Sequence, residues 1–120
     1  MSIAADREQL VTALDALDAT VTGYVPERVA APAVIVTEGP LFVRPSSTFG
    51  SWTVTYDGLL LVPVGSNEAM IRALDELVDA LLNLLGTSAE WDLDQVRPYE
   101  LVTLNGARYL GTIATITTTI

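Results

Sequence analysis

The chain has 120 residues, a formal net charge of −9, and neither cysteine nor histidine. Its length fits a single domain that spans residues 1–120. The missing side chains exclude disulfides, thiolate and imidazole catalysis, and zinc sites built on sulfur or nitrogen ligands. All six basic residues are arginine, so lysine-dependent chemistry is excluded as well.

The first predicted element is a helix that begins near Asp6. Apolar residues recur at helical spacing between Leu10 and Val21, and Asp6 followed by Gln9 resembles a capping box. We expect the helix to end at Gly23, because glycine is common just past a helix C-terminus.

Two strands are expected next, separated by a loop. Residues Ala33–Thr37 are β-branched and apolar, which predicts a short buried strand. Residues Leu41–Gly50 mix apolar side chains with proline, serine and glycine, which predicts an irregular, exposed excursion. Residues Ser51–Val64 alternate at first and are then apolar on both faces. We therefore expect one long strand with a bulge at Gly58, in preference to a hairpin.

The strongest helical pattern covers Asn67–Leu85, with Ser66 or Asn67 as the N-cap and Gly86 at the end. A polar connection over residues 87–98 follows. Two further strands then flank Asn105-Gly106, a dipeptide typical of a type I′ hairpin turn. The predicted order α-β-β-α-β-β indicates an α+β fold with two helices packed on one face of a mainly antiparallel sheet.

The final strand, Ile113–Ile120, contains neither charge nor proline. Such a strand either lies inside the sheet or presents an edge that pairs with another chain, and we interpret it as an uncapped edge. The irregular loop adds aromatic and arginine side chains, which are common interface anchors, although its two phenylalanines could instead fold back on their own sheet. The candidate interface residues are Phe42, Arg44, Phe49, Ile113, Ile116 and Ile120.

Carboxylates are the only side chains left for acid–base or metal chemistry, and they form no recognisable site. Asp75 and Asp79 fall on the polar face of an amphipathic helix, where acidic residues keep the surface hydrated. The motif Asp92-Leu-Asp94 begins like a calcium loop, but the third ligand and the tight-turn glycine are replaced. We expect no catalytic residue, no metal and no cofactor.

Several patterns follow one another along nearly the whole chain: the opening helix, Val21–Pro26, the aromatic strand Phe49–Tyr56 leading into Leu59–Pro63, the helix Asn67–Leu85, and the closing run Tyr109–Thr118. This arrangement resembles the tail terminator proteins of long-tailed, siphovirus-type phages, particularly small versions from phages of actinobacterial hosts. The family is non-enzymatic, and the resemblance therefore implies no catalytic residues.

The resemblance implies a homo-oligomeric ring, typically a hexamer, that binds the last ring of the tail-tube protein. Such a ring stops tube polymerisation and offers a surface to the head–tail connector protein. The implied location is the tail and neck of the virion, with assembly in the host cytoplasm. DNA would pass through the ring without specific binding, and no membrane is implied as a partner.

Three alternatives stay open at this point. A phage neck or head–tail connector protein would have a similar size, acidity and element order. A small ligand-binding α+β regulatory module would hold an apolar metabolite against its sheet or helices. A carboxylate-dependent hydrolase would need two acidic residues that face each other across a pocket.

The charge of the chain predicts that the free protein has no measurable affinity for duplex DNA at moderate salt. Nine excess negative charges repel phosphate, and the six arginines are scattered along the sequence. Band-shift titration measures this directly. Binding that weakens steeply as salt is added would contradict the prediction and reveal a basic patch.

Overall fold

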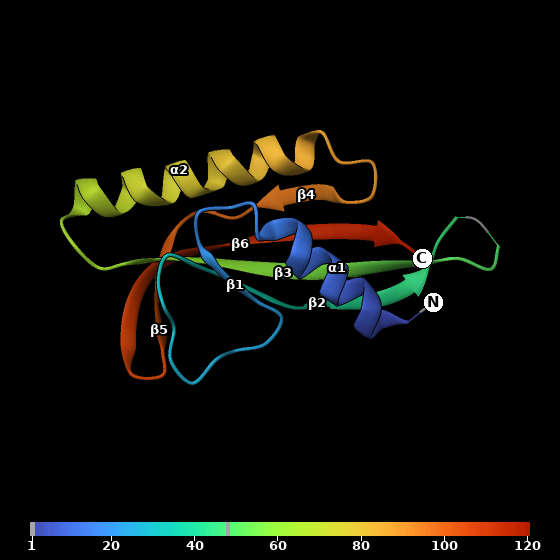
Figure 1. The fold of residues 1–120 in the computed structure, drawn as a ribbon, viewed down its shortest axis with the longest axis horizontal. Coiled ribbons are helices and arrows are strands. Elements are labelled where there is room, and N and C mark those ends of the chain that lie inside the picture. The colour runs from blue at the N-terminus through green and yellow to red at the C-terminus, as the bar shows by residue number, and fades with distance from the viewer. Residues whose placement is uncertain (1, 48) are drawn as a thin grey trace.

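A mixed, mainly antiparallel sheet carries both helices on one face (Figure 1). The structure, a computed structural model, describes residues 2–47 and 49–120. These residues form two helices and six strands in the order α-β-β-β-α-β-β-β. The predicted α+β class and the placement of the helices are confirmed, and two short strands are added to the predicted order.

The sheet is built around two long inner strands, Trp52–Pro63 and Ala107–Thr119, each of which pairs with other strands on both sides. The elements are α1 (Ile3–Leu14), β1 (Thr20–Thr22), β2 (Ala33–Pro45), β3 (Trp52–Pro63), α2 (Asn67–Gly86), β4 (Asp92–Val96), β5 (Glu100–Leu104) and β6 (Ala107–Thr119). The hydrogen-bonded order is β1-β2-β3-β6-β4, and β5 also pairs with β6. Among the described strand pairs, β1 with β2 is the parallel one.

The first helix differs from the prediction at both ends. Its N-cap is Ser2, whose hydroxyl accepts a hydrogen bond from the Ala5 amide at 3.1 Å. The predicted capping box at Asp6 is wrong, because serine is an equally good cap and lies earlier in the chain. The helix ends at Leu14, and Val21 belongs to β1 instead. By contrast, α2 has nearly its predicted bounds, with the Ser66 hydroxyl accepting from the Ala69 amide.

The expected irregular loop is largely strand. The register of β2 against β3 shifts between Glu38 and Val43, and pairing then resumes as far as Pro45. The predicted excursion is therefore mainly a β-bulge, an insertion that local sequence patterns do not reveal. The prediction that β3 is one long strand is confirmed, but its register runs through Gly58 without a bulge.

The prediction that Ile113–Ile120 is an uncapped edge is wrong. One side of β6 pairs with β3 from Tyr109 to Thr119, and β4 and β5 share the other side. Backbone hydrogen bonds between Trp52 and Ile120, at 2.8 and 2.9 Å, continue the pairing to the last residue. The apolar strand needs no charge or proline because β4, which was expected to be a polar connection, covers it.

The main core lies between the helices and the sheet. Leucines from α1 and α2 meet the helix-facing side of β2, β3 and β6, and the buried set includes Leu10, Leu14, Leu74, Leu77, Leu81, Val54, Tyr56, Leu60 and Ile116. A smaller cluster lies on the opposite face, where Ile35, Leu61 and Tyr109 pack with Val29 and Ala31 of the connection between β1 and β2. The helix-free face is therefore partly covered by this connection.

The β5–β6 turn has the backbone of a type I′ turn, with φ of 52° at Asn105 and 80° at Gly106. We expect Gly106→Ala to lower the free energy of unfolding by about 1–2 kcal/mol in urea titration, because a Cβ strains this left-handed conformation. Gly65→Ala is the control. An added Cβ meets nothing within 4 Å at either position, but Gly65 has no positive φ. Equal losses in the two variants would contradict the explanation.

Candidate interaction surface

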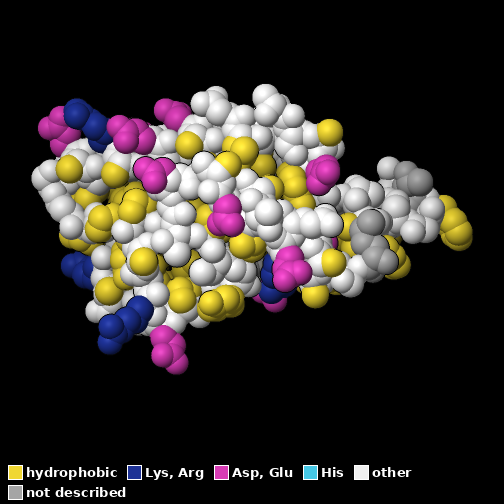
Figure 2. Space-filling view, viewed as in Figure 1, with side chains coloured by type: hydrophobic (Ala, Val, Ile, Leu, Met, Phe, Trp, Pro, Cys, Tyr) yellow, Lys and Arg dark blue, Asp and Glu magenta, His cyan; other side chains and the backbone are white. Residues whose placement is uncertain are grey.

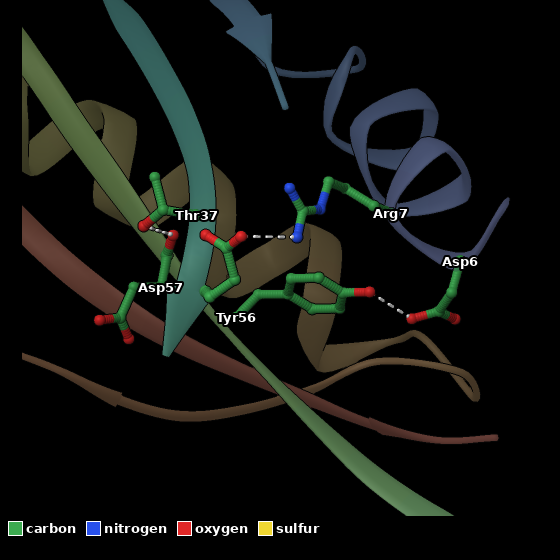
Figure 3. Close-up of polar contacts among 6 residues, drawn as sticks. Asp6, Arg7, Thr37, Tyr56 and Asp57 are labelled. Carbon is green, nitrogen blue, oxygen red and sulfur yellow. Dashed lines mark hydrogen bonds and ion pairs between the residues drawn. The ribbon is translucent and has the colours of Figure 1, made fainter. Parts of the chain in front are cut away.

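A buried hydrogen bond anchors α1 to the sheet. Tyr56 of β3 is fully buried, and its hydroxyl donates to Asp6 Oδ2 at 2.7 Å (Figure 3). Asp6 lies in the first turn of α1, where the positive end of the helix dipole favours a carboxylate. Because buried polar groups are unfavourable without partners, this pair fixes the position of α1 over β3.

The next residue, Arg7, joins α1 to the bulge of β2. Its Nη2 lies 3.2 Å from Glu38 Oε1 (Figure 3). Its guanidinium carbon lies 5.7 Å from the centroid of the Phe42 ring. Phe42 in turn packs edge-to-face on Tyr56, with the ring centroids 5.6 Å apart. Helix, bulge and β3 therefore meet in one cluster of charged and aromatic side chains, which we call the anchor cluster: Asp6, Arg7, Glu38, Phe42 and Tyr56.

The environment of the anchor cluster sets the protonation states of its members. A backbone hydrogen bond, and then the hydrogen bond and charge of Arg7, hold the pKa of Glu38 below its usual value. Burial, and then the hydrogen bond and charge of Asp6, raise the pKa of Tyr56 far above its ordinary value. Tyr56 is therefore a neutral hydrogen-bond donor and Glu38 a charged partner at neutral pH, which suits a structural joint better than proton transfer.

Beyond the anchor cluster, the β2–β3 hairpin projects from the body of the molecule (Figure 1). We call residues 41–47 and 49–52 the arm. Phe49 is fully exposed, Leu41 is 68% exposed and Trp52 is 48% exposed. Figure 2 shows hydrophobic side chains at the tip of this projection, and acidic side chains scattered among further hydrophobic ones over the body. Large exposed apolar side chains that gather in one place are typical of an interaction surface.

The arm also differs from the body in charge. The stretch 39–56 contains no acidic residue, although the chain has 15 of them, and Arg44 is its only charged residue. The arm is consequently an apolar, weakly cationic surface on a strongly acidic protein.

The loop residues predicted to form an interface fall into two groups. Arg44 and Phe49 are exposed on the arm. Phe42 is half-buried at the base of the arm, where it packs on the main core. Phe49 is therefore available for an interface, whereas Phe42 folds back on its own sheet.

The three isoleucines of the final strand do not share a surface. Ile116 is fully buried in the main core, and Ile120 is partly buried and packs against that core. Ile113 is half-buried on the opposite face of the sheet from Ile116. The structure does not bring these side chains together with Arg44 and Phe49 into one patch, because β6 lies inside the sheet.

A second surface feature lies along α1, where the helix, the end of β1 and the residues just after it line an open groove of about 1370 Å³. Its lining includes Ile3, Glu8, Val11, Val21, Tyr24 and Glu90. Ile3 and Tyr24 are exposed. We call this feature the α1 groove, and it combines apolar side chains with two carboxylates and with Arg7, which is paired with Glu38.

Sequence reasoning missed both the anchor cluster and the α1 groove. One local signal for the anchor cluster existed, because Asp6 precedes Leu10 and Leu14 at four-residue spacing and so shares their apolar face. A carboxylate on such a face needs a buried partner. Nothing in the sequence indicates that Tyr56, fifty residues away, is that partner.

No protein-family model and no curated protein sequence matches this chain. Within residues 2–47 and 49–120, acidic side chains nowhere gather as a set of three that could hold a metal ion. Neither described helix has the length and apolar character needed to cross a membrane. The arm, the α1 groove and the sequence pattern are therefore the features on which a function can be based.

The anchor cluster predicts that Tyr56→Phe lowers the free energy of unfolding by about 1–3 kcal/mol at neutral pH, because Asp6 stays buried without its donor. Urea titration measures the loss. Tyr99→Phe is the matched control, since its hydroxyl donates to Asp75 at 2.6 Å on an exposed helix surface. We expect about 1 kcal/mol or less there, and equal losses in the two variants would contradict the role of the buried pair.

The same pair should respond to alkaline pH. In the unfolded chain the Tyr56 phenol ionises near its ordinary pKa of 10.0, whereas burial and Asp6 raise its folded pKa well beyond that value. The stability that this shift contributes is therefore fully present below pH 10 and is lost as the pH rises toward the folded pKa. Wild-type stability should fall more steeply above pH 10 than that of Tyr56→Phe, and parallel curves would contradict the shift.

Proposed function

We propose that this chain is a structural virion protein, a tail terminator that forms a ring on the head-proximal end of a phage tail tube. The ring stops tube polymerisation and provides the surface that the head–tail connector binds. The observation that carries the proposal is the arm, an acid-free and largely apolar projection from an acidic body. The order of sequence patterns supports the more specific assignment to the terminator family.

The arm suits protein–protein assembly for an energetic reason. Burying a fully exposed phenylalanine against a partner contributes roughly 1.5–3 kcal/mol. The arm is also held in place before binding, because the anchor cluster braces its β2 side and β6 pairs with its β3 side as far as Trp52. A braced hairpin loses little conformational entropy on docking, and more of the burial energy is kept as affinity.

The acidic body suits a channel through which DNA passes. Carboxylates repel phosphate within roughly one Debye length, about 10 Å at 0.1 M salt, so a ring lined by them conducts DNA without retaining it. The arm, which lacks acidic residues, is the part of the chain best suited to approach another acidic subunit.

Gene position and a deletion test the proposal. We expect the gene to lie between those for head completion and the major tail-tube protein. In the phage that encodes the chain, its deletion should leave filled heads and overlong, headless tails, because an unterminated tube keeps growing. Electron microscopy of the lysate measures tail length directly. Joined particles with tails of normal length would overturn the proposal.

The same experiment separates the terminator from its alternatives. Loss of a neck connector should leave tails of normal length beside unjoined heads. Loss of a ligand-binding regulatory module should leave both tail length and joining intact, and the purified module should be stabilised by its ligand in a saturable way. Tail length is therefore the decisive measurement.

A further inference from the structure

We infer that the arm of one copy docks into the α1 groove of a second copy, with Phe49 as the anchor side chain. The contact is head-to-tail, since the two surfaces belong to different parts of the chain. The inference deepens the proposed ring and rests on the proposed function for its biological setting.

Shape and polarity match between the two surfaces. Phe49 is fully exposed, so it does not occupy the α1 groove of its own chain. The groove offers apolar side chains from both of its walls, Ile3 and Val11 from α1 and Val21 and Tyr24 from the segment opposite. Its volume of about 1370 Å³ exceeds what one phenyl ring fills, so it accommodates a hairpin tip rather than a single side chain.

The charges of the arm and the α1 groove favour docking of a second copy in this orientation. Arg44 is the only charged residue of the arm, and the α1 groove contributes Glu8 and Glu90 beside Arg7, whose charge is already paired with Glu38. Docking the arm in the groove places opposite charges together, which fixes orientation and register. An arm-to-arm dimer would instead bring two copies of Arg44 together. A groove-to-groove dimer would bring four carboxylates together, while each Arg7 is already paired with Glu38. Both symmetric arrangements are disfavoured by like-charge repulsion.

The geometry of such a contact explains how a ring could form. A head-to-tail contact leaves one free arm and one free groove at the ends of every open oligomer, so growth continues until the ring closes. A symmetric contact would stop at two copies. One kind of contact, between an arm and an α1 groove, is therefore sufficient to build a ring in which every subunit uses each surface once.

Two single variants test the contact, one on each surface. Phe49→Ser alters the arm, and Glu8→Arg alters the groove by placing a cation where Arg44 should dock. Both residues are exposed, so thermal melting should match the wild type. We expect sedimentation velocity to show wild-type oligomers larger than a dimer, and each variant to associate roughly 30-fold or more weakly, as hot-spot residues do. Leu101→Ser, at an exposed apolar position on β5, is the control and should associate like the wild type.

Mixing the two variants tests the head-to-tail arrangement. Phe49→Ser keeps an intact groove and Glu8→Arg keeps an intact arm, so an equimolar mixture should form a one-to-one heterodimer and nothing larger. The charge reversal Arg44→Glu should weaken association, and adding Glu8→Arg to it should restore association. A wild-type chain that stays monomeric at every concentration, or variants that associate normally, would overturn the inference.

The outcomes distinguish this inference from the proposed function. If Phe49→Ser leaves self-association intact but gives overlong tails, the arm meets the tail tube and the inference fails while the proposed function stands. If the mixed variants form the heterodimer but deletion of the gene leaves tails normal, the contact exists and the proposed function fails. If Phe49→Ser is monomeric while Glu8→Arg associates normally, the contact is an arm-to-arm dimer and the inference fails.

Discussion

The hydrogen bond from Tyr56 to Asp6 is the contact on which the rest of the surface depends. It holds α1 at one position over β3, and the adjacent Arg7 then reaches both Glu38 and the Phe42 ring at the bulge. The base of the arm is consequently fixed by the same helix that forms one wall of the α1 groove. Arm and groove are thus positioned relative to each other by one cluster of side chains, and a change at Tyr56 should affect both.

The sheet protects its edges in a way that the sequence suggested only in part. The charge-free run Ile113–Ile120 was interpreted as an exposed edge, yet it belongs to β6, which pairs with other strands on both sides. In β2 the part that β1 does not pair carries Pro40, Pro45, Arg44 and a bulge, which are the features that discourage edge-to-edge pairing. The composition of each strand therefore reflected its position correctly. The edge prediction failed because the short, polar segment that forms β4 was interpreted as a connection.

Local patterns predicted those parts of the fold that depend on neighbouring residues. The amphipathic repeat of α2, the alternation of β3 and the Asn105-Gly106 turn all occur where expected, because each is specified within a few residues. The bulge in β2, the pairing of β4 and the partnership of Asp6 with Tyr56 depend on residues far apart in the chain. Phe42 and Phe49 illustrate the limit: both lay in one predicted loop, but tertiary contacts half-bury the first and leave the second exposed.

The distribution of charge gives the arm its specificity. A uniformly acidic protein of charge −9 resists self-association, and this resistance favours a single well-defined contact over many weak ones. In this chain the stretch 39–56 lacks acidic residues, so the repulsion is weakest where the arm approaches a partner. The acidity of the body therefore disfavours alternative contacts between subunits, and it disfavours DNA binding for the same reason. The arm is left as the surface that can bind an acidic partner.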